Sequence, residues 1–468
     1  MTTIRVLYIS HNHPAVRPGG AEQYALELYE AMRDSKCVEP VLVAKAGPPI
    51  SSMIRHHEGT IFNRVGSDPN QLFAHTDGTT YDWLLGTSRD KELLTRHFRD
   101  FLLALQPDIV HIQHTLFFGY DLVRLLRRVL PKVPIVYTLH EFLPICHRNG
   151  QMIRTVDDRP CLTASPLRCH ECFPSISPQT FFMRTRLIKS HLDMVDRFIA
   201  PSRFLMERFV DWGIPRERMI CEDYGRSIRS ARTEVRLHTE PPRRWPDRFG
   251  YFGQLSAFKG VTVALEAMRV IENSTAPSME HARFGNTQIL MAENGSSIQS
   301  ARHPHLWVHG ANLELQPGSF QNRFNELVRT AKNVTFIGPY ESGDVLELMR
   351  RVDWIVVPSI WWENSPLVIQ EAFASGRPVI CSDIGGMAEK VIDGVNGLHF
   401  RAGDPRSLAG QLNRAAESSA LWNRLRSAIP DICGMDAHVE VLVALYEELL
   451  GSTELADRVT RTRAEVKV

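Results

Sequence analysis

Two glutamates, Glu363 and Glu371, stand eight positions apart around the run Asn364-Ser365-Pro366, which is suited to start a helix. Ser365 can accept hydrogen bonds from the first helical amides, and Pro366 fits the first helical position. The free amides of such a turn, at the positive end of the helix dipole, form an anion site. At about 1.5 Å per residue the two carboxylates lie about 12 Å apart. That span suits one carboxylate on a sugar and one on ribose hydroxyls, with a diphosphate between them, although solvated helices also carry glutamates at this spacing.

Two adjacent glycines indicate a second site of this kind near the amino terminus. Gly19 and Gly20 follow a strand-like run that ends at Ser10, and they open a strongly helical segment. Glycine lets the backbone approach a ligand closely, and the amides of the first helical turn point outward. The pattern fits a phosphate bound at the start of the helix, and it fits a tight turn into an ordinary helix equally well.

Four of the eight cysteines fall within one short segment, as Cys146, Cys161, Cys169 and Cys172. The spacing Cys169-x-x-Cys172 lets two thiolates bind one tetrahedral metal ion, and the other two cysteines can complete the set. His147 and His170 are spare candidates. The pattern predicts a structural zinc site, with reduced loop cysteines as an alternative of equal weight.

Apolar runs of strand length are spaced so that each half of the chain can form a sheet. They begin near residues 4, 40, 108, 134, 197 and 218 in the first half, and near 249, 305, 333, 354, 377 and 397 in the second. Strands that are apolar on both faces and separated by helix-length segments imply a parallel sheet covered by helices. We therefore expect an α/β protein with two successive doubly wound, Rossmann-like units.

A polar, proline-containing stretch, residues 226–248, places the domain boundary near residue 240. Residues 1–240 are the expected amino-terminal domain and residues 241–430 the carboxyl-terminal one. A periodic helix from Asp436 lies in 431–452, and a charged tail fills 453–468. The stretch 272–305 is longer than a usual connection and predicts a loop insertion with one extra strand at TQILMA.

Composition and charge limit the classes of function. Lys plus Arg is 54 and Asp plus Glu is 53, so the net charge of +1 offers no global field for a nucleic acid. The chain has no apolar run long enough to span a bilayer, and its first residues lack a signal-peptide pattern. A cytoplasmic location is expected. Residues 177–198 place aromatic beside basic side chains, which can contact anionic lipid at the inner face of the membrane, although such helices more often pack into a core.

The segment PSIWWENSPLVIQEAFASGRPVICSDIGGMAEK begins at Pro358 and carries E-x7-E after a PS-x-W loop, then G-x-P-V, then GG-x-x-E at Gly385, Gly386 and Glu389. It resembles the retaining glycosyltransferases of family 4, which have the GT-B fold of two Rossmann-like domains facing a central cleft. The first half is similar too, in RPGGAE, in YTLHE and in APSRFLMERFVDWGIPRERM. The similarity covers roughly residues 4–450, and the insert at 146–172 resembles one in a cysteine-rich subgroup of that family.

The resemblance implies a role for several residues. Glu371 resembles the carboxylate that binds ribose, and Glu363 the one that contacts the donor hexose. His140 resembles the histidine that contacts the donor sugar near the reacting centre. The turn whose backbone meets sugar and phosphate corresponds to Asn364, Ser365, Pro366 and Leu367. The helix from Asp436 resembles the one that returns to the amino-terminal domain.

One position departs from the family pattern. Members usually place an Arg and a Lys after the first strand of the second domain, whereas GYFGQLSAFKG offers Gln254 and Lys259 beside Gly253 and Gly260. A glutamine donates hydrogen bonds but adds no charge. Stabilisation of the leaving diphosphate is therefore expected to fall on Lys259 and the helix amides. The alternative for Lys259 is a solvated loop lysine.

The function implied by the resemblance is retaining transfer of a sugar from a nucleoside diphosphate sugar to an acceptor hydroxyl, in polysaccharide, O-antigen or other glycoconjugate biosynthesis. His140, Lys259 and Glu363 are the expected catalytic residues, with no cofactor and no catalytic metal. The expected partners are the donor and a glycan, lipid-linked or small-molecule acceptor. The alternatives are a phosphorylase or epimerase of the same fold, or a non-catalytic sugar-nucleotide-binding protein, which Gln254 favours. The sequence leaves open the nucleotide (UDP, GDP or ADP), the sugar and the oligomeric state.

Overall fold

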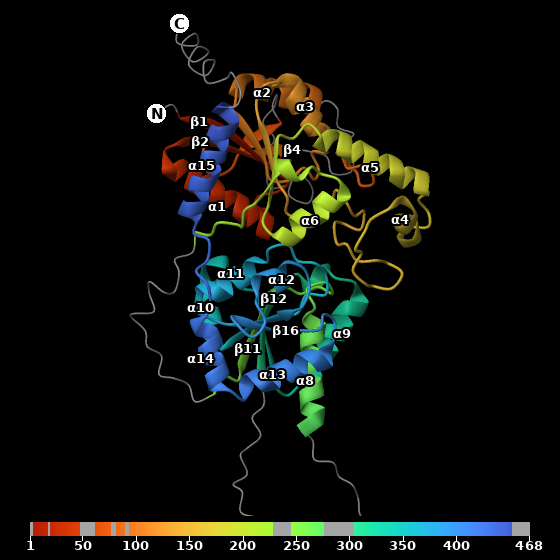
Figure 1. Ribbon diagram of the computed structural model, residues 1–468, viewed down its shortest axis with the longest axis vertical. Coiled ribbons are helices and arrows are strands. Elements are labelled where there is room, and N and C mark those ends of the chain that lie inside the picture. The colour runs from red at the N-terminus through yellow and green to blue at the C-terminus, as the bar shows by residue number, and fades with distance from the viewer. Residues whose placement is uncertain are drawn as a thin grey trace, which may run out of the picture. The chain divides into compact units, whose positions relative to one another are not determined.

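The computed structural model of the chain describes residues 3–16, 19–46, 61–75, 81–88, 93–227, 245–275 and 304–451. The chain divides into two compact units (Figure 1). Unit 1 consists of Met1–Arg229, Trp361–Pro366 and Ile432–Val468, and unit 2 of Ser230–Ile360 and Leu367–Asp431. The predicted boundary near residue 240, the predicted strand TQILMA and the charged tail lie outside the described residues.

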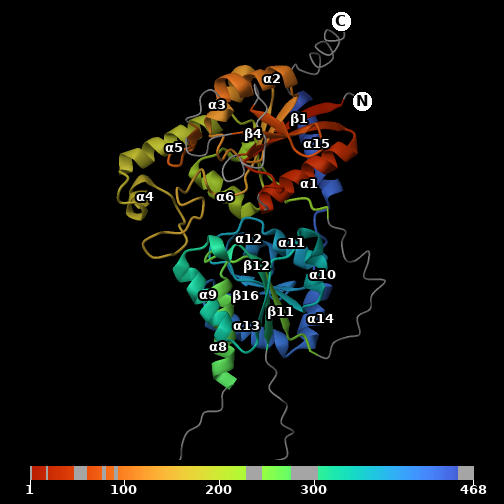
Figure 2. The same cartoon turned by 180° about the vertical axis from the view of Figure 1, so that it is seen from behind.

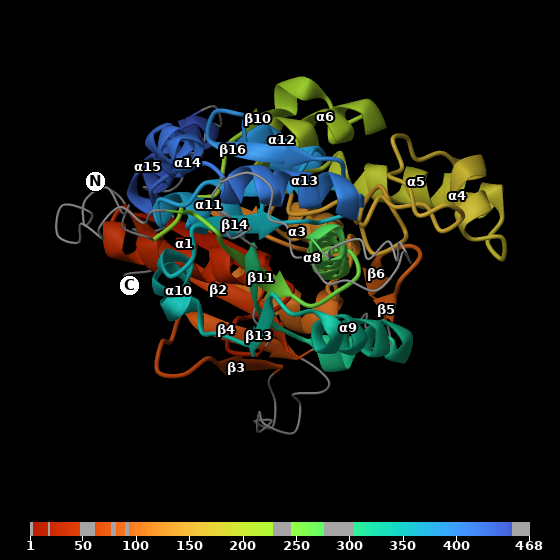
Figure 3. The same cartoon turned by 90° about the horizontal axis from the view of Figure 1, so that it is seen from below.

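Unit 1 is built on an eight-stranded sheet with the order β10-β9-β8-β7-β1-β2-β4-β3. Its strands are β1 (Ile4–Ser10), β2 (Val38–Ala46), β3 (Phe62–Arg64), β4 (Gln71–His75), β7 (Ile109–Ile112), β8 (Ile135–Thr138), β9 (Arg197–Ala200) and β10 (Met219–Cys221). All neighbours pair in parallel except β3, which pairs antiparallel with β4 at the edge of the sheet (Figure 3). A separate pair consists of β5 (Tyr81–Asp82) and β6 (Thr87–Ser88). The six runs predicted for this half all form strands, and the parallel, doubly wound arrangement is confirmed.

The helices of unit 1 cover this sheet, and three of them begin at a serine whose hydroxyl caps the first turn. The helices are α1 (Gly20–Ser35), α2 (Arg99–Leu105), α3 (Asp121–Val129), α4 (Pro166–Cys172), α5 (Pro178–Leu192), α6 (Arg203–Trp212) and α15 (Met435–Gly451), with a π-helical turn at Leu93–Phe98 before α2. The hydroxyl of Ser202 accepts from the amide of Leu205 at the start of α6. That helix ends at Gly213, whose φ of 111° is left-handed. α6 is therefore bounded by two residues of its own sequence.

The last helix, α15, packs beside α1 within unit 1 (Figures 1 and 2). The hydroxyl of Tyr446 lies 2.6 Å from Nδ1 of His111 and 3.2 Å from the hydroxyl of Tyr8, and Nε2 of His111 lies 2.7 Å from Oγ1 of Thr138. All four side chains are essentially inaccessible to solvent. Because buried polar groups are costly when unpaired, this network fixes how α15 docks on the sheet.

The His111 network is expected to make folding sensitive to acid. Burial, with a smaller effect of His438, lowers the pKa of His111 to about 3, whereas an unfolded histidine titrates near about 6.5. Between about pH 6.5 and about pH 3, His111 is protonated in the unfolded chain but stays neutral in the folded chain. The free energy of unfolding therefore falls as the pH drops through this range. At pH 5.5 the loss from this group is roughly 1.4 kcal/mol. Denaturant unfolding at pH 7.5 and 5.5 measures it. The pH dependence should shrink in His111→Gln, and an unchanged dependence would contradict the assignment.

Unit 2 is built on a six-stranded, fully parallel sheet with the order β13-β12-β11-β14-β15-β16. Its strands are β11 (Arg248–Gln254), β12 (His305–Ala311), β13 (Val334–Gly338), β14 (Trp354–Val357), β15 (Val379–Ser382) and β16 (Gly397–Phe400). β11 lies in the middle, and the next strands along the chain are added to one side before β14 is added to the other. This reversal of strand order is where doubly wound sheets bind their ligands, at the carboxyl ends of the strands.

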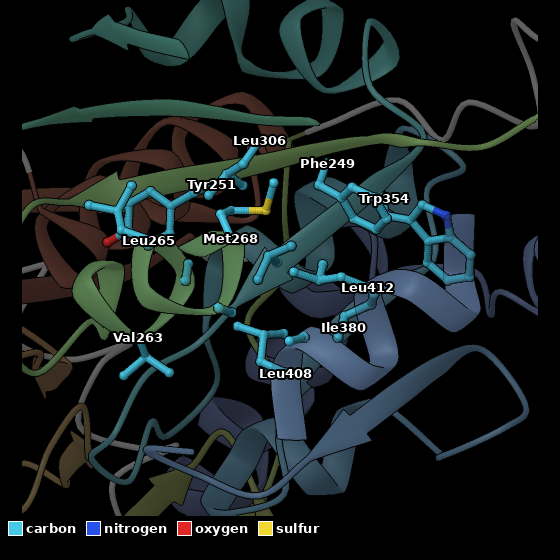
Figure 4. Close-up of a cluster of buried hydrophobic side chains, with 14 of the residues drawn as sticks. Phe249, Tyr251, Val263, Leu265, Met268, Leu306, Trp354, Ile380, Leu408 and Leu412 are labelled. Atoms are coloured by element: carbon cyan, nitrogen blue, oxygen red, sulfur yellow. The ribbon is translucent and has the colours of Figure 1, made fainter. Parts of the chain in front are cut away.

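The core of unit 2 lies where two helices pack on that sheet. The helices of the unit are α8 (Val261–Thr275), α9 (Gly318–Thr330), α10 (Val345–Arg350), α11 (Leu367–Ala374), α12 (Gly385–Lys390), α13 (Pro405–Ala416) and α14 (Ser419–Ser427). Met268 of α8 and Leu412 of α13 point into the cluster that contains Phe249 and Trp354 (Figure 4). The two aromatic rings stack with centroids 6.5 Å apart, and the indole N–H of Trp354 donates to the carbonyl of Pro246. Together they tie β11 to β14. Among the described residues, no helix is long and apolar enough to cross a membrane.

Candidate active site

Three histidines follow the carboxyl ends of neighbouring strands in unit 1. His11 follows β1, His114 follows β7 and His140 follows β8, so parallel pairing brings them to one edge of the sheet. The rings of His11 and His114 lie with centroids 4.1 Å apart. They stand between β1 and β7, where the strand order of this sheet reverses. The strand ends therefore gather imidazoles at the position where such a sheet binds ligands.

His140 is held through both ring nitrogens. Its Nδ1 lies 2.7 Å from the hydroxyl of Tyr224, and its Nε2 lies 3.0 Å from Oε1 of Gln113. Burial, reinforced by the neighbouring His114 and His11, lowers the pKa of His140 well below its usual range. The imidazole is therefore neutral near pH 7. A neutral ring in this position can orient a hydroxyl group but supplies no charge.

A small, partly open hollow lies beside His140. Its lining residues are Gln113, His114, Tyr120, Tyr137, Leu139, His140, Glu141, Leu143 and Pro144. Within the described residues, Nε2 of Gln113 and the hydroxyl of Tyr120 are buried without a hydrogen-bond partner. Glu141 lies in the same wall, and its Oε1 is 2.8 Å from Nε2 of His114. Unsatisfied donors and a carboxylate therefore give this hollow a polar wall that can hydrogen-bond a hydroxyl group.

The glycines at the start of α1 make room for a carboxylate of the protein itself. A Cβ at Gly19 would lie 2.4 Å from Oε2 of Glu22, so this side chain folds back over the helix terminus. Its Oε1 lies 3.0 Å from Nε2 of His11, and these interactions lower the pKa of Glu22 despite its burial. Gly20 is the first residue of the helix. The predicted phosphate site at Gly19 and Gly20 is thus next to a negative charge that an anionic ligand would have to displace.

The loop Trp361–Pro366 clusters with unit 1, although the residues on either side of it belong to unit 2. Glu363, Asn364 and Ser365 are all buried there. The side-chain amide of Asn364 has four partners. Its Oδ1 accepts from Ser202 at 2.9 Å, and its Nδ2 lies within donating distance of the carbonyls of Leu139 and His140 and of the hydroxyl of Tyr224, at 3.3 to 3.4 Å. The side chain of Asn364 is therefore engaged by the protein, which leaves the loop backbone as the part that can meet a ligand.

Two other side chains of the loop are positioned in the same way. The hydroxyl of Ser365 donates to Oδ1 of Asp223 at 2.8 Å, and α11 begins at Leu367, one residue beyond the expected Pro366. The indole N–H of Trp361 donates to Oε1 of Glu363 at 2.8 Å. These contacts orient the turn and hold one carboxylate oxygen of Glu363.

Gln254 is the last residue of β11 and Lys259 follows that strand, at the reversal point of unit 2. Gln254 is exposed and Lys259 is half-buried. Their loop packs against the end of β14, because the amide of Ile360 donates to the carbonyl of Phe258 at 2.9 Å. Gly260 has a φ of +68°, and a Cβ there would lie 1.8 Å from the carbonyl oxygen of Pro358. Only glycine allows this approach, which brings the Lys259 loop to the strand end that leads into the predicted anion turn.

Glu371 lies on α11, half-buried, on the helix that follows β14. Burial, and to a smaller extent the charge of Glu371, raises the pKa of Tyr340, so these two side chains lie near each other. Gly385 and Gly386 open α12 after β15, with a φ of +60° at Gly385, and Glu389 lies in the same helix. Gly253 is the next-to-last residue of β11 and has a φ of +150°. The predicted donor residues Gly253 and Glu371 and the glycine motif of α12 therefore lie at or beyond the carboxyl ends of three strands.

The four cysteines of the predicted zinc site are free, half-buried thiols. Within the described ranges, one group of three metal-type ligand atoms lies within 4.8 Å of one another, and it consists of Glu222, Cys433 and His438. In that group both nitrogens of His438 already have partners, Glu222 at 3.1 Å and the hydroxyl of Tyr24 at 2.7 Å. We interpret it as a hydrogen-bonded junction between α1, α15 and the end of β10.

Sequence reasoning did not single out Gln113, Glu141, Asp223 or Tyr224. Each follows the carboxyl end of a parallel strand, and this position was the one feature of the sequence that could have indicated a functional residue. Without the order of the strands, however, nothing indicated that residues after β7, β8 and β10 would converge on His140 and the loop at 361–366.

Two domain families match the chain. Residues 19–225 match the family described as "Glycosyl transferase 4-like domain", and residues 278–418 match "Glycosyl transferases group 1". The chain therefore has the GT-B fold that the motifs predicted, and each of its halves matches a glycosyltransferase domain family.

Individual relatives agree with this class. The chain is 28% identical over 185 residues to D-inositol 3-phosphate glycosyltransferase of Stackebrandtia nassauensis, which is 39% of this chain and 36% of that protein. It is 27% identical over 183 residues to glycogen synthase of Mycobacterium tuberculosis, 39% of this chain and 37% of that protein. The match thus spans little more than a third of the length of either relative.

Solved structures share the fold over almost the whole chain. HepE of Anabaena in complex with UDP-glucose gives a TM-score of 0.58 at 16% identity, covering 96% of this chain and 99% of that one. Sucrose-phosphate synthase of Thermosynechococcus elongatus gives a TM-score of 0.65 at 17% identity, covering 96% and 100%. At this level of identity the likeness establishes the fold alone.

Proposed function

We propose that this protein is a retaining glycosyltransferase that moves a sugar from a nucleoside diphosphate sugar to an acceptor hydroxyl. The observation that carries the proposal is the arrangement at the reversal point of unit 2. There the backbone at Gly260 packs closely against the carbonyl group of Pro358, so the Lys259 loop lies next to the end of β14. The turn that leads into α11 follows this strand end. A lysine beside a helix start on the carboxyl edge of a parallel sheet suits a diphosphate.

In the proposed reaction the acceptor oxygen bonds to the anomeric carbon on the face from which the phosphate oxygen departs. The acceptor proton passes to that departing oxygen, so no protein base is required. Lys259 and the backbone of Asn364–Leu367 stabilise the charge that develops on the diphosphate. His140 is buried and neutral, and both of its ring nitrogens are hydrogen-bonded. Such an imidazole is better suited to orient a sugar than to remove a proton, which supports this scheme.

We assign the other residues by their surroundings. Glu371 binds the ribose hydroxyls and Glu363 a hydroxyl of the transferred sugar, with neither acting as a metal ligand. The backbone at Gly19, Gly20, Gly253 and Gln254 supplies further contacts to the donor. The unsatisfied donors of Gln113 and Tyr120 beside His140 support a sugar or acceptor hydroxyl in that pocket. The acceptor is a glycan, a lipid-linked glycan or a small molecule.

A thermal-shift panel of UDP, GDP, ADP and CMP tests the donor assignment. A ligand that binds only the folded state at 100 times its Kd stabilises the protein by about 2.7 kcal/mol. One nucleoside diphosphate is expected to raise Tm well above the others, and the monophosphate should do little. A panel in which none of them shifts Tm at millimolar concentration would contradict a nucleotide-sugar donor.

A second candidate is a non-catalytic sugar-nucleotide-binding protein, favoured by the uncharged and exposed Gln254. Such a protein would show the same thermal shift but would release no nucleoside diphosphate from any donor. Turnover across a broad acceptor panel therefore separates the two candidates.

We also propose peripheral contact with the cytoplasmic membrane face through residues 177–198. Phe182 and Met183 of α5 are 53% and 60% exposed beside the exposed Arg186, whereas Phe181 and Arg184 are buried. Co-sedimentation with anionic vesicles should weaken in the Phe182→Ser, Met183→Ser double variant. Equal sedimentation of the variant and the wild type would exclude this surface.

A further inference from the structure

The segment that holds the four clustered cysteines is organised by its own backbone. Cys146 begins a tight turn, in which the amide of Gly150 donates to its carbonyl at 3.1 Å. A short hairpin follows, with an antiparallel bridge between Ile153 and Pro160. The amide of Cys161 then donates to the carbonyl of Met152 at 2.6 Å. The hairpin therefore returns Cys161 to the turn that contains Cys146.

The helix α4 adds the other two thiols to this assembly. Cys169 and Cys172 are three residues apart on α4, so their side chains share one helix face. Two contacts fasten the hairpin to this helix. The hydroxyl of Thr155 donates to the carbonyl of Cys172 at 2.6 Å, and Arg154 pairs with Glu171 at 3.2 Å. The turn, the hairpin and the helix thus bring all four cysteines to one small body.

Backbone groups are directed at two of the sulfur atoms. The sulfur of Cys146 accepts from the amides of Arg148 and Met152, and the thiol of Cys161 donates to the carbonyl of Thr163 at 3.5 Å. Amide donors to sulfur favour the thiolate form, and they are the contacts that orient the ligands of a metal site.

A buried positive charge lies next to these thiols. Arg184 of α5 is 4% exposed, and its donors are taken by the carbonyl oxygens of Leu84, Pro144 and Leu143. None of these partners is charged, although a buried cation is costly unless a negative charge compensates it. Cys146 and Cys169 are the groups of this segment whose ionised forms act on Arg184. A centre in which thiolates outnumber the charges of one divalent ion would supply the missing negative charge.

We propose that Cys146, Cys161, Cys169 and Cys172 together bind one zinc ion, and that this ion fixes the wall of the pocket beside His140. A set of four thiolates in tetrahedral geometry selects zinc. Ligation would draw the sulfur atoms to about 3.8 Å from one another, from Zn–S bonds of about 2.3 Å. No three of them lie within 4.8 Å in the described structure, so the side chains must close around the ion.

The role of the ion follows from the position of the segment. Leu143 and Pro144 line the pocket, Arg184 holds their carbonyls, and Cys146 is the second residue after Pro144. Loss of zinc should therefore loosen this wall. If the proposed transfer is correct, KM for the acceptor should rise severalfold, while nucleotide binding in unit 2 should be unchanged. Zinc binding itself does not depend on that function.

Elemental analysis of untagged protein, purified without chelators, provides the test. We expect one zinc ion per chain, lost in Cys161→Ser and in Cys172→Ser. Cys37→Ser is the matched control, because Cys37 is exposed and lies outside the segment. It should retain the full zinc content.

A second measurement covers variants that fail to fold. Wild-type protein grown in cobalt should show the strong visible absorption of tetrahedral thiolate-bound Co²⁺, and zinc should bleach it. Zinc-free wild-type protein whose Tm does not change with added zinc would overturn the proposal. Stoichiometric iron with an iron–sulfur spectrum would overturn it as well.

Discussion

Replacing Lys259 by alanine is expected to lower turnover by about 10²- to 10³-fold, the usual cost of removing one group that stabilises transition-state charge. The effect should exceed that in relatives with two cations here, because Gln254 offers no second charge. Since the diphosphate of the intact donor carries less charge than it does once the bond breaks, the Kd for the donor should change by less than about tenfold. Steady-state kinetics with the best donor, beside isothermal titration of that donor without acceptor, measures both quantities.

A second lysine of the same unit provides the control. Lys332 is exposed and precedes β13, so it lies at the amino ends of the strands, the edge opposite Lys259. Lys332→Ala should retain full turnover. Lys259→Arg should recover part of the lost rate, because it keeps the charge. Equal turnover in Lys259→Ala and the wild type would remove Lys259 from the mechanism.

Replacing Glu371 by alanine is expected to weaken binding of the nucleoside diphosphate by about 10- to 100-fold, since a hydrogen bond to a charged group contributes about 1.5–3 kcal/mol. The reason is the loss of a carboxylate that accepts from ribose hydroxyls. Comparing the diphosphate with its 2′- and 3′-deoxy forms isolates that contact. A deoxy form should bind the wild type more weakly, and the penalty should vanish in Glu371→Ala.

The control here is Glu347→Ala. Glu347 is an exposed glutamate on α10 of the same unit, paired with Arg351 on the surface. Its removal should leave the affinity unchanged. If the deoxy penalty survives in Glu371→Ala, Glu371 does not bind the ribose.

The pattern of apolar runs was sufficient to predict the sheets, because buried parallel strands are apolar on both faces. Four of the described strands were not predicted from this pattern. β4 follows a polar stretch and contributes Phe73 and Ala74 as its buried apolar residues, β3 is a short antiparallel edge strand, and β5 and β6 have two residues each. The motif at 358–371 could be placed on a strand end, a turn and a helix for the same reason, since Pro366 and the apolar run after it have strong local preferences.

Long-range partners could not be predicted from the sequence. Ser365 has the type and position of a helix cap, yet its hydroxyl donates to Asp223, 142 positions away. Arg184 belongs to a basic and aromatic segment that suits a lipid surface, yet it is buried against the carbonyls of residues 143–145. In both cases the local sequence pattern suggests a role for the side chain, but a long-range contact determines which group the side chain binds.

The most direct test of the proposed transfer is release of nucleoside diphosphate from UDP-, GDP- and ADP-sugars, in the wild type and in Lys259→Ala. We expect one donor class to be consumed by the wild type, faster with an acceptor than without. The rate in the variant should be at least about 10²-fold lower, while the diphosphate still binds. A wild-type protein that binds a nucleoside diphosphate but releases none from any of these donors, with any acceptor, would contradict the account.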